Sequence, residues 1–277
     1  MRLIVRRALD LDFALDLQVE EPTLRAMLER ALAALPAART TPTVGYRVSR
    51  ESEGLELGWG AEPVRRSASP TELLDALIAH LNLAAIAASR GQLLLHTGGV
   101  ALPDGRVILL SGPSGSGKTT LTAELVGTGM AYLTDETLGV DAVTLAITPY
   151  RKPLTVKPGS FAVLSHLAPD DSAAQGALPW QVPVDRLGGP GLPTEPLRVA
   201  LVVAPEYAAR TGTRLERIGS AETVFRLGSN SSSLSAVRPR PLQALARLVN
   251  GVPSYRLPYS DVTAARDLVL AALGGAR

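Results

Sequence analysis

The 277-residue sequence contains no cysteine, which excludes disulfide bonds, thiolate metal sites and thiol catalysis. A dense basic block is also missing. The 28 lysines and arginines nearly balance 26 acidic residues, so the net charge is only +2 although the isoelectric point is about 9.1. We therefore expect no nucleic-acid partner.

Long apolar segments are absent as well. No run of about 18 uncharged apolar residues is present, so we expect no membrane partner. The first residues include early acidic side chains and lack the apolar region of a signal peptide, which favours a cytoplasmic location. Hydrophobic residues at 46% and charged residues at 19% are typical of a globular protein with a sizeable core.

A glycine-rich segment at residues 109–121, LLSGPSGSGKTTL, fits the G-x-x-x-x-G-K-[ST] template. An apolar run at 106–110 before this segment predicts a buried strand, and apolar residues at helical spacing after it predict a helix. The glycines let backbone N–H groups converge on phosphate oxygens, and the helix dipole adds positive charge. The segment predicts a loop that binds a nucleoside triphosphate, formed by Gly112, Pro113, Ser114, Gly115, Ser116, Gly117, Lys118, Thr119 and Thr120.

Two side chains of this loop supply further chemistry. Lys118 provides a mobile positive charge for the β- and γ-phosphates, and the Thr119 hydroxyl can ligate the Mg²⁺ that bridges them. A triphosphate with Mg²⁺ is therefore the expected ligand.

Two carboxylates follow the next predicted strand, at residues 130–134. Asp135 and Glu136 come 17 and 18 residues after Lys118, which is room for a helix, a turn and a returning strand. Ligands collect at the carboxyl edge of such sheets. One carboxylate could accept the proton of an acceptor hydroxyl while the other helps to hold Mg²⁺, although a solvated acidic turn would have the same pattern.

His96 ends a predicted strand at residues 92–96 and could contact the γ-phosphate, or be a structural histidine bonded to backbone. A basic group further along the chain could neutralise phosphate charge or simply be solvated; its members are Arg151, Lys152 and Lys157.

The order of expected strands and helices predicts a small α/β unit at residues 1–69 before a catalytic core at 70–277. In the N-terminal unit, we expect a strand at 3–5, a helix from Pro22 to Pro36, and a hairpin of strands 44–48 and 55–57. In the core, we expect a long helix starting at Pro70, a buried strand at 199–204 and a final helix after Asp261. The proline- and glycine-rich residues 168–196 predict an irregular loop or lid.

The segment from 96 to 141, HTGGVALPDGRVILLSGPSGSGKTTLTAELVGTGMAYLTDETLGVD, resembles the catalytic core of the HPr kinase family and its relatives. The resemblance continues more weakly in RKPLTVKPGSF and PSYRLPYSDVTAARDLV, and covers about two thirds of the chain. It implies an α/β fold with the P-loop core shared by phosphoenolpyruvate carboxykinases and HPr kinases, joined to the small N-terminal α/β unit.

The resemblance also implies roles. ATP would occupy the loop, His96 would stand near the transferred phosphoryl group, Asp135 would be the base, and Glu136 would assist with Mg²⁺. The sequence departs from the family where HPr kinases usually have Asp-Asp and Ser in place of Asp135-Glu136 and Thr119. Residues 170–195 do not resemble the HPr-binding part of that family, nor do the first 69 resemble its N-terminal domain, so HPr is not the expected acceptor.

These observations predict an ATP- and Mg²⁺-dependent kinase that phosphorylates a hydroxyl, serine above all, of a peptide or protein. By resemblance to peptide-tailoring kinases, the acceptor could be a precursor peptide of a biosynthetic pathway. Two alternatives remain open: a small-molecule hydroxyl kinase and a nucleotide-gated interaction module without phosphotransfer. An oligomer is compatible with each of these functions.

Overall fold

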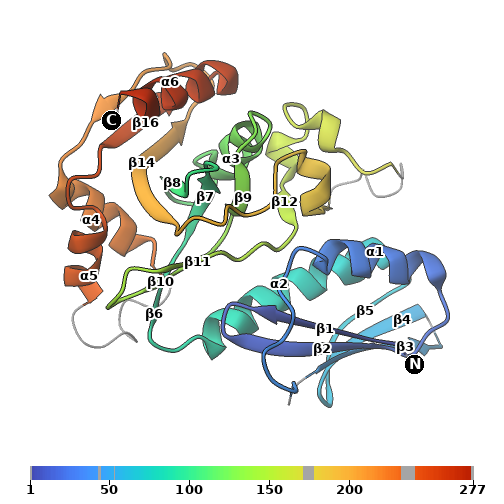
Figure 1. Cartoon of the computed structure of the whole chain (residues 1–277). Helices are drawn as coiled ribbons and strands as arrows, with labels where there is room; N and C mark the ends of the chain where they lie inside the picture. The colour runs from blue at the N-terminus through green and yellow to red at the C-terminus, as the bar shows by residue number, and fades with distance from the viewer. Residues whose placement is uncertain (1, 43–44, 53, 171–177, 232–240, 276–277) are drawn as a thin grey trace. The chain divides into compact units, whose positions relative to one another are not determined.

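The structure is a computed structural model that describes residues 2–42, 45–52, 54–170, 178–231 and 241–275. The chain divides into two compact units (Figure 1). Unit 1 comprises residues 1–89 and 151–186, and unit 2 comprises residues 90–150 and 187–277. This division differs from the expected boundary at residue 69 in two ways: the long helix groups with the N-terminal strands, and so does the later segment 151–186.

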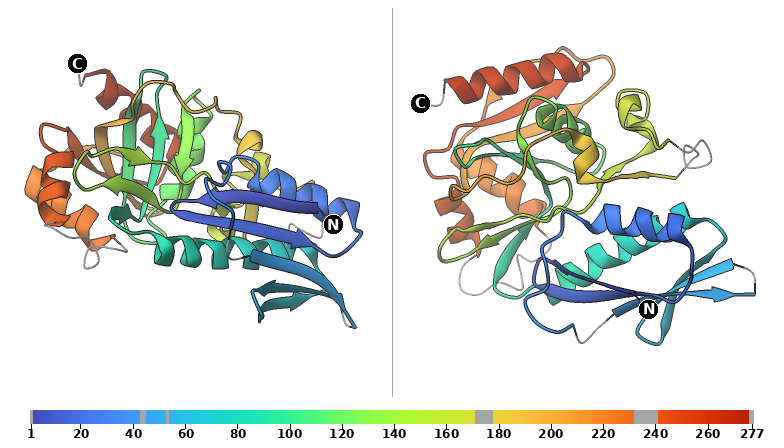
Figure 2. Two further views of the ribbon diagram at one scale, coloured as in Figure 1. Left: turned by 60° about the horizontal axis from the view of Figure 1, so that its bottom comes forward. Right: turned by 45° about the vertical axis from the view of Figure 1, so that its right-hand side comes forward.

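Unit 1 is built on a five-stranded sheet in the order β1-β2-β3-β4-β5. All neighbouring strands are antiparallel except β2 and β3, which are parallel. Two helices lie on one face of this sheet (Figure 1, Figure 2). The elements are β1 (Arg2–Ala8), β2 (Leu11–Leu17), α1 (Pro22–Leu32), β3 (Gly45–Glu51), β4 (Gly54–Trp59), β5 (Glu62–Ser67) and α2 (Pro70–Ala88).

The later segment of unit 1 forms a small hairpin-like pair of β12 (Leu154–Val156) and β13 (Trp180–Val182), which are antiparallel. The described part of this segment also contains the short 3-10 helices η1 (Pro158–Ser160), η2 (Ser165–Leu167) and η4 (Val184–Leu187). The Gln181 side chain of β13 donates a 2.8 Å hydrogen bond to Asp75 of α2. This contact ties the segment to the long helix.

Helix α2 begins as its sequence predicts. The Ser69 hydroxyl accepts the backbone N–H of Glu72 at 3.4 Å and Pro70 takes the first helical position. By length and mean hydropathy, 1.4 over 18 residues, this is the one described helix that could cross a membrane. Its leucine stripe, however, is buried within the protein, with Leu73, Leu77 and Leu81 at most 1% exposed.

Unit 2 is organised around a six-stranded sheet in the order β15-β16-β14-β8-β7-β9, with a second sheet in the order β11-β10-β6. The strands are β6 (Gln92–Leu95), β7 (Thr97–Ala101), β8 (Arg106–Ser111), β9 (Ala131–Thr134), β10 (Leu138–Asp141), β11 (Ile147–Thr148), β14 (Arg198–Tyr207), β15 (Glu216–Arg217) and β16 (Ser254–Tyr259). The helices are α3 (Lys118–Val126), α4 (Ser220–Ser229), α5 (Pro241–Leu248) and α6 (Val262–Gly274).

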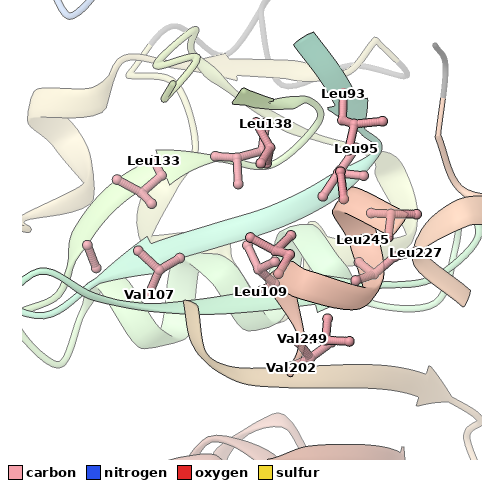
Figure 3. Close-up of a cluster of buried hydrophobic side chains, with 14 of the residues drawn as sticks. Leu93, Leu95, Val107, Leu109, Leu133, Leu138, Val202, Leu227, Leu245 and Val249 are labelled. Atoms are coloured by element: carbon pink, nitrogen blue, oxygen red, sulfur yellow. The ribbon is translucent and has the colours of Figure 1, made fainter. Parts of the chain in front are cut away.

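The core of unit 2 fills the space between the six-stranded sheet, the second sheet and the helix pair α4 and α5 (Figure 3). Val107 and Leu109 of β8 point into this cluster. Because side chains alternate along a strand, Leu110 faces the other side. On that side a Cβ on Gly98 would collide with the Thr122 side chain of α3 and also meet Leu110, so α3 covers the opposite face.

The strand directions bring several chain segments to one sheet edge. Strands β14 and β16 run parallel to β8, whereas β7 is antiparallel to both β8 and β9. Strand β9 is therefore parallel to β8. It follows that the carboxyl ends of β8, β9, β14 and β16 and the amino end of β7 meet at this edge, where ligands bind in sheets of this kind.

Most expected elements of the two units are present, but two expectations need correction. The apolar residues 145–147 also predict a strand from sequence, but the strand begins only at Ile147, because Leu145 has a positive φ of 63°. The predicted irregular loop at 168–196 contains β13 and η4, while residues 171–177 lie outside the described residues.

Candidate functional site

The glycine-rich loop joins β8 to α3 at this edge, as its sequence predicts. Gly115 and Gly117 have positive φ angles of 83° and 93°, a conformation that favours glycine. A Cβ on Gly117 would also collide with the Tyr259 hydroxyl. The turn into α3 therefore requires glycine at this position for two independent reasons.

Lys118 is the first residue of α3 and is only 5% exposed. Its Nζ donates hydrogen bonds to the carbonyl oxygens of Gly112, at 2.6 Å, and Pro113, at 3.0 Å. The ammonium group is thereby held inside the curve of the loop. Phosphate oxygens bound in the loop would accept hydrogen bonds from the same Lys118 ammonium group.

Asp135 follows β9 and is buried, with 3% of its surface exposed. One carboxylate oxygen accepts a 2.8 Å hydrogen bond from the Tyr132 hydroxyl, and the other lies 3.4 Å from the Thr119 hydroxyl. The structure thus brings Asp135 beside the loop residue that was expected to ligate Mg²⁺.

Tyr132 is a site residue that the sequence analysis missed. Burial raises its pKa well above 10, and the neighbouring Asp135 charge adds to the shift. The phenol therefore keeps its proton and serves as a permanent donor to Asp135. A tyrosine in a buried strand has no sequence signal for this role, since its partner is fixed by the turn after β9.

Glu136 and His96 form a second pair at the same edge. His96 Nδ1 lies 3.3 Å from Glu136 Oε1, and their side chains are 28% and 33% exposed. Backbone hydrogen bonds hold both residues in place. The His96 N–H donates to the Asn230 carbonyl oxygen at 2.7 Å, and the Thr97 N–H donates to the Glu136 carbonyl oxygen at 3.2 Å. This pair is accessible to solvent, whereas Asp135 is not.

The donor set near the loop suits Mg²⁺. The Thr119 hydroxyl and the Asp135 carboxylate offer hard oxygen ligands, which Mg²⁺ prefers. Within the described ranges, no group of three or more His, Asp or Glu side chains could hold a metal ion alone. A cation here would therefore complete its coordination with phosphate oxygens and water, as Mg²⁺ usually does in nucleotide sites.

The expected basic group belongs to unit 1, because Arg151, Lys152 and Lys157 all lie in its later segment. Lys152 is 1% exposed, and its Nζ donates to the Pro153 carbonyl at 3.1 Å and the Thr155 hydroxyl at 3.0 Å. Lys152 thus has partners within its own segment. A role for these three residues at the phosphates stays a prediction.

Tyr259, at the end of β16, is a second residue that the sequence analysis missed. Its hydroxyl donates to the Gly117 carbonyl at 3.3 Å, and burial raises its pKa to about 12. It braces the junction of the loop and α3 from the side opposite Asp135.

No protein-family model matches the chain. It is 28% identical over 198 residues to the putative 2-aminoethylphosphonate import ATP-binding protein PhnT of Salmonella choleraesuis strain SC-B67, and equally to PhnT of Salmonella typhimurium strain LT2. The alignment covers 66% of this chain and 52% of PhnT, so the chain spans about half the length of these curated relatives. The similarity supports a P-loop protein that binds ATP.

Proposed function

We propose that the chain is an ATP- and Mg²⁺-dependent kinase that transfers the γ-phosphoryl group to a hydroxyl, above all a serine, of a peptide or protein. The supporting observation is the meeting of Lys118, Asp135 and the Glu136–His96 pair at one sheet edge. A loop that only bound Mg²⁺-ATP would use Asp135 for the metal but would not need the Glu136–His96 pair. The HPr kinase resemblance agrees with the proposal and with a core of the phosphoenolpyruvate carboxykinase type.

In the proposed reaction, Lys118 and the loop N–H groups hold the triphosphate and neutralise its charge. Mg²⁺, held by Thr119 with Asp135 directly or through water, would supply further neutralisation of the phosphate charge. The acceptor oxygen attacks the γ-phosphorus and forms a new P–O bond. The bond from the γ-phosphorus to the β,γ-bridging oxygen breaks, and ADP leaves with the electron pair.

The hydroxyl proton needs a base that the acceptor can touch, within about 2.6–3.2 Å of the hydroxyl. Asp135 is 3% exposed and has Tyr132 and Thr119 on its two oxygens, whereas the Glu136 side chain is 33% exposed. These contacts favour an exchange of the roles expected from the sequence. Glu136, oriented by His96, takes the proton, and Asp135 serves the metal.

The experiment is a transfer assay with γ-labelled ATP and serine-containing peptides, including candidate precursor peptides. Glu136→Gln should abolish transfer and leave Mg²⁺-ATP binding within about twofold, because only the base is lost. Asp135→Asn should weaken Mg²⁺-ATP binding as well as transfer. Asp267→Asn, an acidic residue on α6 with its side chain 62% exposed, is the matched control and should change neither.

Unaltered transfer by Glu136→Gln would contradict its role as the base. Transfer abolished by Asp135→Asn with Mg²⁺-ATP binding intact would instead support the original assignment of Asp135 as the base.

A second candidate is ATP hydrolysis or ATP-gated partner binding without an acceptor, favoured by the similarity to import ATP-binding proteins. It predicts labelled inorganic phosphate, or nucleotide-dependent partner binding, with no labelled product from any peptide or small-molecule hydroxyl. A small-molecule kinase would instead label metabolites but no peptide. In each case, the use of ATP agrees with the expected cytoplasmic location.

A further inference from the structure

The edge of the unit 2 sheet has two chemically different flanks around the phosphate loop. In the order β15-β16-β14-β8-β7-β9, the loop follows β8 at the centre. The flank of β7 and β9 carries His96, Asp135 and Glu136. The other flank, of β14 and β16, ends in two tyrosines, Tyr207 and Tyr259.

The tyrosines form a unit that contacts the loop. Tyr207 and Tyr259 are register partners on parallel strands, and their rings are 5.5 Å apart in an edge-to-face arrangement. Tyr259 is 1% exposed and its hydroxyl reaches the Gly117 carbonyl. The Tyr207 backbone N–H donates to the Ser116 carbonyl at 3.2 Å. Tyr207 is thus fixed beside the loop at its backbone and at one ring edge.

Tyr207 as a residue is nonetheless 53% exposed, and with Phe225 it is one of two exposed aromatic residues among the large hydrophobic residues that the structure describes as exposed. An aromatic ring that is held in place on two sides presents a rigid apolar face to solvent. An exposed ring beside a phosphate loop has the form of a stacking surface for a planar ligand.

We propose that Tyr207 is the platform on which the base of the bound nucleotide stacks. This inference rests on the proposed function only in that a nucleotide occupies the loop. Acid-base groups on the β7 and β9 flank place the reacting γ-phosphate there, so the nucleoside must extend to the opposite flank. Neighbouring strands lie about 4.8 Å apart, so the ends of β14 and β16 lie within about 10 Å of the end of β8. That is the reach of a nucleoside.

Stacking recognises the face of a base and not its hydrogen-bonding edge, so the platform serves adenine and guanine alike. The test is calorimetric binding of Mg²⁺-ATP, Mg²⁺-GTP and Mg²⁺-tripolyphosphate to the full chain. Tyr207→Ala should weaken ATP and GTP about tenfold each, and tripolyphosphate less than about twofold. Tyr207→Phe should bind all three like the wild type, because the ring and not the hydroxyl makes the contact.

Phe225→Ala is the matched control, since this aromatic residue on α4 is 72% exposed and lies outside the site. The change should leave the affinity for all three ligands unaltered.

Tyr207→Trp gives an independent readout. The two natural tryptophans, Trp59 and Trp180, both lie in unit 1, so the new indole would be the only one in unit 2. ATP and GTP should quench its fluorescence and tripolyphosphate should not, with the wild-type signal subtracted.

Unchanged ATP affinity in Tyr207→Ala, or an equal loss for ATP and tripolyphosphate, would overturn the platform. If the protein bound ATP but transferred no phosphoryl group, the proposed kinase function would be overturned and the stacking role of Tyr207 would still stand. If the wild-type protein bound tripolyphosphate as tightly as ATP, only the stacking proposal would be overturned. If it bound neither ATP nor tripolyphosphate, the stacking proposal and the kinase proposal would both be overturned.

Discussion

The two units bury their charged groups in different ways. In unit 1, the buried carboxylate of Glu56 is paired with Arg66 at 2.6 Å and Arg47 at 3.7 Å, all on one sheet. In unit 2, the buried Lys118 begins α3 and the buried Asp135 follows β9, and both lie beside the phosphate loop at the sheet edge. The first arrangement satisfies charges locally, whereas the second collects them at one edge.

The difference shows where the chemistry lies. Collecting buried charges around a loop costs stability, and such groups are retained where they serve a ligand. We therefore expect substitutions of buried polar groups in unit 2 to change ATP binding or phosphotransfer, and those in unit 1 to change stability alone.

The largest effect is expected for Lys118→Ala. The change removes the only side-chain cation of the loop, so phosphotransfer should fall by at least about a hundredfold. Mg²⁺-ATP binding, measured by calorimetry, should weaken with it. Lys157→Ala in unit 1 is the informative counterpart. A similar loss of phosphotransfer in Lys157→Ala would contradict the difference between the two units, because it would mean that a cation of unit 1 acts on the phosphates.

Tyr132→Phe should have the next largest effect. It removes the hydroxyl that donates to Asp135 and leaves a buried carboxylate oxygen without this donor, at a cost of about 1–3 kcal/mol in the stability of unit 2. Because Tyr132 positions Asp135 and does not touch substrate, kcat should fall about tenfold with little change in the KM for the acceptor. Full activity would show that Asp135 keeps its place without the phenol.

The sequence predicted the site to the extent that it depends on local structure. The loop was recognisable because its glycines, Lys118 and Thr119 act within one strand-loop-helix unit, and His96 and Asp135 were recognisable as strand-end residues. Tyr132 and Tyr259 were missed because their partners depend on sheet register and on a turn. The grouping of residues 151–186 with unit 1 was missed for the same reason: a contact such as that of Gln181 with Asp75 joins residues far apart in sequence.

Glu56→Gln in unit 1 should give a smaller effect of a different kind. The isosteric amide removes the charge that Arg66 and Arg47 share and should cost about 1 kcal/mol. Both tryptophans lie in unit 1, so denaturant unfolding followed by tryptophan fluorescence reports on this unit selectively. ATP affinity should stay within about twofold of the wild type, and a larger change would show that unit 1 contributes to the site.

The smallest effect is a pH dependence of unit 1 that arises from His80. Burial lowers the pKa of His80 below its ordinary value of 6.5, and the Tyr46 hydroxyl lies 2.8 Å from His80 Nδ1. Burial also raises the pKa of Tyr46, so the phenol keeps its proton and shares a hydrogen bond with the neutral imidazole. The unfolded chain therefore takes up a proton at a higher pH than the folded chain.

By linkage, the contribution of His80 is complete above pH 6.5 and is lost as the pH falls from 6.5 through the lower pKa of the folded state. The fluorescence-detected unfolding midpoint should decline over this range in the wild type and less so in His80→Gln. Trp59, whose ring centre lies 5.4 Å from that of His80, reports the change directly. ATP affinity in the two proteins should have the same pH profile, because the titrating group belongs to unit 1 and the nucleotide loop to unit 2.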